Sequence, residues 1–187
     1  MTIIFKKFRL IAVSFVISLL FISVSSAAPR PNQKFDDWLF HCTNVAVQGD
    51  VENLSTEAPE KETCALYQSL AARNRPRFGV VVLFEKYTGA QNPDTKIVAT
   101  IKMLAPLGIL LTQGITLTID GEKLGSTPLF RCLPNGCTSA TNITEATMAK
   151  FIAGETATIT IFLTPDDGIA IPIKLSGLKD GFAVLNK

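Results

Sequence analysis

The chain has 187 residues and a net charge of +2, from 18 basic and 16 acidic residues, and it contains four cysteines. This length predicts one domain with a hydrophobic core of its own. Only 18% of the residues are charged, and no long run of like charge occurs, which argues against an ordinary nucleic-acid-binding protein. Composition alone does not identify a function.

The first residues have the pattern of a secretory signal peptide. Basic residues within positions 6–9 precede an uncharged run over 10–24, and small residues follow it. This order is typical of a cleaved export signal. The apolar run has 15 residues, fewer than the roughly 20 that span a bilayer as a helix. We therefore expect residues 1–27 to be a signal peptide that is removed after Ala27.

The remaining chain, 28–187, is then the mature protein, and we expect it to form a single β-rich domain. Removal of the signal takes away three basic and no acidic residues, which leaves a net charge of −1. No later stretch reaches the roughly 18 uninterrupted apolar residues of a membrane-spanning helix. We therefore expect an exported protein without a transmembrane segment in its mature form, so that any association with a membrane is peripheral.

After a signal peptide, the four cysteines predict two disulfides formed in an oxidising compartment. Three pairings are possible. A turn sequence at 134–136 lies between Cys132 and Cys137 and would bring these two residues together. We expect them to be bonded and, by elimination, Cys42 to be bonded to Cys64. Zinc binding is not expected, because the cysteine spacing and the single histidine do not match a structural zinc site.

Strand-like segments dominate the mature chain. They are rich in β-branched and aromatic residues and are bounded by Gly, Pro, Asn or Asp. We expect strands at residues 37–42, 63–70, 78–86, 96–104, 115–119, 129–133, 156–163 and 169–175. Strands of this length and number predict an all-β fold, mainly an antiparallel β-sandwich or barrel.

One short helix and two hairpin turns complete the predicted elements. Over residues 144–153, Thr144 can cap a helix whose apolar residues recur at helical spacing, and Gly154 can end it. Asp120 with Gly121, and residues 166–168, predict tight turns between apolar runs.

The sequence contains no recognisable catalytic, cofactor-binding or metal-binding motif. The only histidine, His41, precedes a cysteine that we expect to be oxidised, and a disulfide sulfur is not a nucleophile. We expect His41 to be partly buried and hydrogen-bonded, and the acidic pairs at 36–37 and 166–167 to lie in turns or at strand edges. We therefore expect a protein that is not an enzyme and that uses no metal or cofactor.

Arg73, Arg75 and Arg77 concentrate positive charge in a predicted turn between two strands. Such a cluster can bind an anionic surface, for example lipopolysaccharide, sialylated glycans or an acidic protein patch, or it can be a solvated loop. We treat the three arginines as a candidate interaction patch. Trp38 and Phe40, in the first predicted strand, are expected to belong to the core.

Several short motifs follow one another in a fixed order. They are Asp37 and Trp38 before Cys42, then Cys64, residues 108–111 leading to 115–121, residues 128–132 with 136–137, and the segments 150–154 and 176–182. In this order they resemble the invasion-associated locus B family of secreted alphaproteobacterial proteins. The resemblance covers essentially the whole mature chain and is most specific from residue 108 to residue 137.

The resemblance implies a small β-rich envelope protein that is exported to the periplasm or the outer membrane, with exposure at the cell surface as a further expectation. Pathogenic members contribute to entry into host cells, erythrocytes in particular, so the resemblance implies a virulence-associated protein. Its partners would be the host cell surface or components of the bacterial envelope. It implies no catalytic residues. The alternative function is a periplasmic structural or binding module that maintains the envelope and affects invasion only indirectly.

Overall fold

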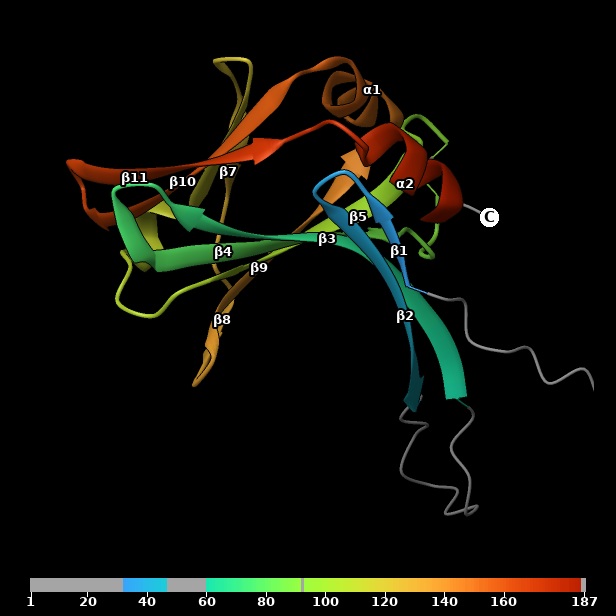
Figure 1. Cartoon of the computed structure of the whole chain (residues 1–187), viewed down its shortest axis with the longest axis horizontal. Helices are drawn as coiled ribbons and strands as arrows, with labels where there is room; N and C mark the ends of the chain where they lie inside the picture. The colour runs from blue at the N-terminus through green and yellow to red at the C-terminus, as the bar shows by residue number, and fades with distance from the viewer. Residues whose placement is uncertain (1–31, 47–59, 92, 186–187) are drawn as a thin grey trace, which may run out of the picture.

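The computed structural model describes residues 32–46, 60–91 and 93–185. The predicted signal peptide and most of the predicted loop between Cys42 and Cys64 lie outside the described residues. Most of the described chain is in antiparallel strands, which form two sheets (Figure 1). The two sheets enclose one hydrophobic core, which confirms the predicted all-β, sandwich-like fold.

The larger sheet has seven strands, and each is antiparallel to its neighbours. In spatial order they are β1 (Gln33–Phe35), β2 (Trp38–Ala46), β3 (Glu60–Ala72), β4 (Arg75–Lys86), β5 (Ile97–Ala105), β9 (Gly136–Thr144) and β8 (Arg131–Leu133). The first five therefore follow chain order, and the later pair, β8 and β9, extends the sheet beyond β5.

The smaller sheet has four strands, and two α-helices lie at one end of the described structure (Figure 1). The strands are β11 (Asp167–Lys174), β10 (Thr156–Thr164), β6 (Ile115–Ile119) and β7 (Glu122–Thr127), and the helices are α1 (Glu145–Ala153) and α2 (Leu178–Leu185). A 3-10 turn, η1 (Leu111–Gln113), precedes β6. None of the described helices is long and apolar enough to cross a membrane.

Alternating side chains of the two sheets fill the core, as the period of two along a strand requires. Trp38 and Phe40 are fully buried, as the sequence predicts, and Phe84 lies between Trp38 and the helix residue Phe151. The Phe84 ring centroid is 5.6 Å from that of Trp38 and 5.4 Å from that of Phe151. Isoleucines of the smaller sheet close the core from the other side: Ile115, Ile159, Ile161, Ile171 and Ile173.

All eight predicted strands and the predicted helix are present, but several other elements were not predicted. These are β1, β7, β9, η1 and α2, so the described chain has two α-helices where the sequence predicted one. Both ends of the predicted loop over 43–61 are strand, because β2 continues to Ala46 and β3 begins at Glu60. The predicted strand at 129–133 is confined to Arg131–Leu133.

Tertiary contacts explain two of the missed elements. β9 consists largely of small and polar residues. It nevertheless pairs along its length with β5, whose own residues favour a strand. α2 contains Gly181, which lowers helix propensity. A Cβ at this position would lie 2.6 Å from Cδ1 of Leu66, so the glycine allows the helix to pack closely against β3.

Both disulfides join residues that lie directly opposite each other on neighbouring strands. Cys42 of β2 is bonded to Cys64 of β3, and Cys132 of β8 is bonded to Cys137 of β9. This is the pairing that the sequence predicts. The first bond connects two long strands within the larger sheet, whereas the second connects the two arms of one short hairpin.

Candidate functional site

The three arginines of the candidate interaction patch lie at the β3–β4 hairpin. Arg73 is in the two-residue turn, Arg75 is the first residue of β4, and Arg77 follows two residues later. All three side chains are exposed. A groove of about 570 Å³ opens between this turn and β11, and Arg73 and Arg75 line it. The hairpin thus places the arginines where the two sheets meet.

Arg75 forms an ion pair with a residue of the smaller sheet. Its Nη1 donates a hydrogen bond of 2.8 Å to Oδ2 of Asp167, the first residue of β11. The hydrogen bond and the negative charge of Asp167 raise the pKa of Arg75 above its ordinary value. The sequence did not predict this ion pair, because the two residues are far apart in the chain and belong to different sheets.

The other two arginines keep their charge available for a partner. Arg77 stacks on the ring of Phe78, with its guanidinium carbon 5.8 Å from the ring centroid, which is the geometry of a cation–π contact. Within the described part of the chain, neither Arg73 nor Arg77 forms an ion pair. Of the predicted patch, therefore, Arg73 and Arg77 are the residues that could bind an anionic group.

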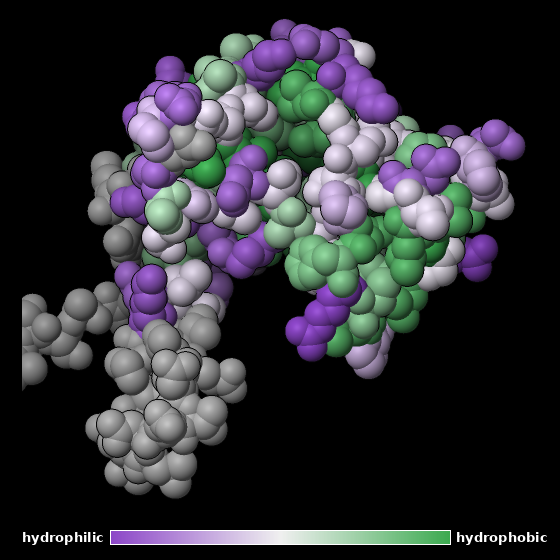
Figure 2. All heavy atoms as spheres, turned by 180° about the vertical axis from the view of Figure 1, so that it is seen from behind, coloured by the Kyte–Doolittle hydropathy of each residue, from purple (hydrophilic) through white to green (hydrophobic). Residues whose placement is uncertain are grey.

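A second feature of the described surface is a group of exposed apolar side chains. Among the described residues, six large apolar side chains are exposed, each at 37% or more, and four of them lie in two segments, 107–111 and 130–133. We call these four residues the apolar end: Leu107, Leu111, Phe130 and Leu133. Their exposed fractions are 51%, 48%, 66% and 39%. Figure 2 shows hydrophobic side chains gathered on the lobe that contains β8, at the lower right of that view.

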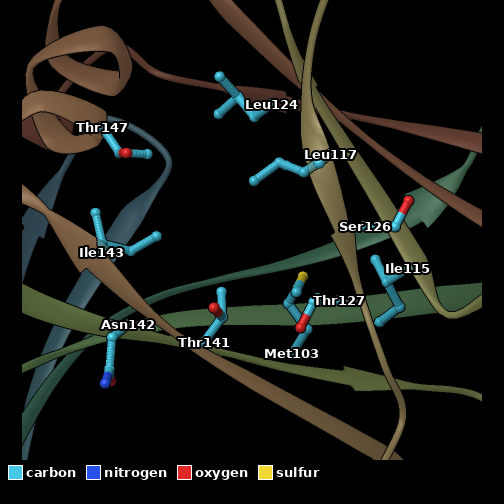
Figure 3. A pocket seen from close by; sticks show the side chains of 11 residues that line it. Met103, Ile115, Leu117, Leu124, Ser126, Thr127, Thr141, Asn142, Ile143 and Thr147 are labelled. Carbon is cyan, nitrogen blue, oxygen red and sulfur yellow. The ribbon is translucent and has the colours of Figure 1, made fainter.

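A separate pocket of about 220 Å³ opens between β7 of the smaller sheet and β9 of the larger one. Its inner wall consists of buried apolar side chains, and Leu117 and Leu124 project into it beside hydroxyl-bearing residues (Figure 3). Leu124 is unpaired in β7, because Leu117 pairs with Gly125 and Thr118 with Lys123. This β-bulge turns Leu124 away from the regular ladder.

The chemistry of this pocket is that of a small apolar cavity with a polar rim. Its apolar lining comprises Met103, Ile115, Leu117, Leu124 and Ile143, and its polar lining comprises Ser126, Thr127, Thr141, Asn142 and Thr147. None of these described side chains titrates near neutral pH. The pocket can therefore hold an uncharged group, but its described lining supplies no general acid or base.

The remaining sequence candidates do not form a reactive cluster. His41 is exposed, not partly buried as expected, because it faces outward on β2; its Nδ1 lies 2.5 Å from Oδ1 of Asn32. Cys42, Glu62 and Cys64 bring three potential metal ligands within 4.8 Å of one another, but the two sulfurs are bonded to each other and offer no thiolate.

Both acidic pairs lie in turns, as expected. Asp36 is in the β1–β2 turn with a φ of 51°, and Asp37 beside it pairs with Lys174 at 3.1 Å. Asp166 is in the β10–β11 turn, and Asp167 begins β11. Of these four carboxylates, Asp37 and Asp167 form ion pairs, with Lys174 and Arg75 respectively.

The described strands and both disulfides define a disulfide-linked, two-sheet β protein. The family model of the Invasion associated locus B (IalB) protein matches residues 53–186. The chain therefore belongs to the IalB family, which confirms the resemblance found in the sequence.

The structure is also similar to a solved one, the crystal structure of invasion associated protein b from Bartonella henselae. The TM-score is 0.58 at 17% sequence identity, and the match covers 83% of this chain and 95% of that chain. At this identity the likeness establishes a common fold. A comparison with curated proteins gives no significant match.

Proposed function

We propose that this protein is an exported, virulence-associated protein that supports bacterial invasion of host cells, erythrocytes in particular, through non-catalytic contacts at the envelope or cell surface. Membership of the IalB family carries this proposal. In it, residues 1–27 act as the export signal, and 28–187 form the mature domain in the periplasm or at the outer membrane.

Two structural features support this proposal. Both pairs of cysteines are bonded, and such bonds form and persist in oxidising compartments such as the periplasm. The lining of the pocket between β7 and β9 carries no titratable side chain, so this pocket supplies no group for acid–base catalysis.

The proposal is tested by deleting the gene and restoring it, with host-cell entry as the measurement. Deletion should reduce entry, and the restored gene should recover it. Protease treatment of intact cells then separates direct from indirect action. Digestion of the protein on intact cells supports contact at the surface. A protein that is protected and confined to the periplasm would instead act by maintaining the envelope, and unchanged entry of the deletion strain would refute the proposal.

The arginine patch is proposed as one of the contacts. Because Arg75 is paired with Asp167, the variant that should matter is Arg73→Ser with Arg77→Ser. A matched control removes two exposed cations elsewhere, Lys123→Ser with Lys179→Ser. Binding of purified protein to host membranes should fall for the arginine variant and stay unchanged for the lysine variant. Equal loss in both variants would assign the effect to net charge and not to this patch.

A further inference from the structure

The two segments of the apolar end come from connections between the sheets. The chain leaves β5 at Ala105 and crosses to β6, and it later returns from β7 to β8 at Arg131. Ala105 lies opposite Cys137, which lies opposite Cys132. These three residues form a row across β5, β9 and β8, so the end of β5 and β8 lie at one end of the sheet (Figure 1).

Close backbone packing holds the two crossings together. Gly114, which follows η1, has a φ of 64°, and a Cβ there would lie 2.5 Å from the backbone oxygen of Thr127. The amide of Leu110 donates a hydrogen bond of 2.6 Å to the carbonyl of Phe162 in β10. The Cys132–Cys137 disulfide fixes the β8–β9 hairpin. The exposed apolar side chains thus project from a surface whose backbone is already ordered.

The charge around this surface is positive. Residues 105–114 and 127–139 contain no acidic residue and one basic residue, Arg131. Its side chain is exposed and forms no ion pair within the described part of the chain. Val81 of β4 pairs with Leu104 of β5. Because the two strands are antiparallel, the chain after Leu104 runs beside the residues before Val81, which include Arg77.

Acidic residues lie beside this end in the β10–β11 turn. Phe162, which accepts the hydrogen bond from Leu110, pairs with Gly168. Asp166 and Asp167 therefore lie in the neighbouring turn, and Asp167 is already paired with Arg75. The charge of Asp167 is thereby offset by Arg75. The charges in this region that form no ion pair with another described residue are then those of Arg77, Arg131 and Asp166, two cations and one anion.

Exposed leucine and phenylalanine side chains on a protruding lobe, with arginines beside them, match the chemistry of a membrane interface. Apolar side chains are favoured among acyl chains, and arginines are favoured at anionic headgroups. A stable protein dimer buries roughly 800 Å² on each partner. The apolar end consists of only four large side chains, so it favours a membrane over a second copy as its partner.

We propose that the apolar end docks on a bilayer of anionic phospholipids. Its four apolar side chains enter the interface, and the arginines beside it contact the headgroup phosphates. This docking surface names anionic phospholipid as the partner in the envelope contact proposed above. The inference rests on that proposed function for the place of the protein in the cell. Vesicle binding tests it with purified components, whereas entry assays test the proposed function, so the two can fail separately.

The experiment measures co-sedimentation of the purified, exported form of the protein with vesicles of equal parts phosphatidylglycerol and phosphatidylcholine. The variant Phe130→Ser with Leu133→Ser should weaken binding about tenfold or more, because both side chains leave the interface. The matched control is Leu39→Ser with Ile152→Ser, which removes two exposed apolar residues of 39% and 37% exposure elsewhere. It should bind as the unchanged protein does, and all forms should melt at the same temperature.

Charge and insertion are tested separately. Arg131→Gln should weaken binding to the anionic vesicles but leave any weak binding to pure phosphatidylcholine unchanged. Since the only tryptophan, Trp38, is fully buried, Phe130→Trp introduces a probe whose emission should shift to the blue on binding, while Ile152→Trp should not shift.

Three results would overturn the proposal. The first is that the unchanged protein does not bind anionic vesicles. The second is that the control loses as much binding as the variant of the apolar end. The third is that Phe130→Ser with Leu133→Ser converts a dimer into a monomer without changing vesicle binding, which would make a second copy the occupant of this surface.

Discussion

Trp38 donates a hydrogen bond of 3.0 Å from its indole Nε1 to the backbone carbonyl of Lys174. Gln68 donates a second hydrogen bond, of 2.9 Å, to the same oxygen. Trp38 and Gln68 are both buried, and they belong to β2 and β3, whereas Lys174 is the last residue of β11. One carbonyl thus links the two sheets, and its two lone pairs are both used.

Trp38→Phe should lower the free energy of unfolding by about 2 kcal/mol, because the substitution removes the indole donor and leaves a small cavity. Urea unfolding measures the change. Leu39→Ala is the control, since Leu39 is the exposed neighbour on the other face of β2, and it should change stability by less than about 0.5 kcal/mol. Equal losses would mean that the link between the sheets does not contribute.

The two disulfides should contribute unequally to stability. They close loops with sequence separations of 22 and 5 residues. On the chain-entropy model these loops correspond to about 3.5 and about 2 kcal/mol. Cys42→Ser with Cys64→Ser should therefore lower the melting temperature more than Cys132→Ser with Cys137→Ser. Equal or reversed losses in a thermal scan would contradict this ranking.

Asp120 should be sensitive to substitution although it is exposed. Its φ is 48°, and its carboxylate accepts hydrogen bonds from the amides of Glu155 and Thr156, the latter at 2.9 Å. Asp120→Ala loses both bonds and strains the backbone, so we expect a loss of about 2 kcal/mol. Asp120→Asn should lose less, since asparagine tolerates this conformation and keeps one acceptor oxygen.

Chemical denaturation of both Asp120 variants measures the difference. Asp166→Ala provides the control, because Asp166 lies in another exposed turn and should change stability little. If Asp120→Ala were as stable as that control, the hydrogen bonds to the start of β10 would not stabilise the fold.

Thr144 caps α1, as the sequence predicts: its Oγ1 accepts a hydrogen bond of 3.1 Å from the amide of Thr147. Thr144→Ala should lower the free energy of unfolding by about 1 kcal/mol, whereas Thr144→Ser keeps the hydroxyl and should cost little. Denaturant unfolding of the pair distinguishes the loss of the cap from a general effect of the site. A similar loss in both variants would rule out capping as the cause.

The strands that could be predicted are those whose own residues favour a strand. β4, β5 and β10 have runs of β-branched and apolar residues, and their local pattern agrees with the final fold. β9 and β7 lack such runs and become strands because β5 and β6 supply a ladder to pair with. A local pattern contains no information on that partner, so these elements were missed.

The candidate surfaces likewise combine features that the sequence predicts with features that it does not. The sequence identified Arg73, Arg75 and Arg77 as a cluster, but it could not reveal that Asp167 binds one of them across the sandwich. Phe130 and Leu133 were assigned to a predicted strand, in which an apolar residue is usually buried. A signal was present in the prolines at 128 and 134, which flank these residues and restrict a regular strand.

The sequence by itself determined the fold class, the disulfide pairing and the family resemblance. Each depends on residues close in the chain or on a fixed order of motifs. Only the tertiary structure decided which residues share a surface, because that depends on the register between strands and on the packing of one sheet against the other. The contact of Trp38 with Lys174, the ion pair of Arg75 and the apolar end all arise from this long-range arrangement.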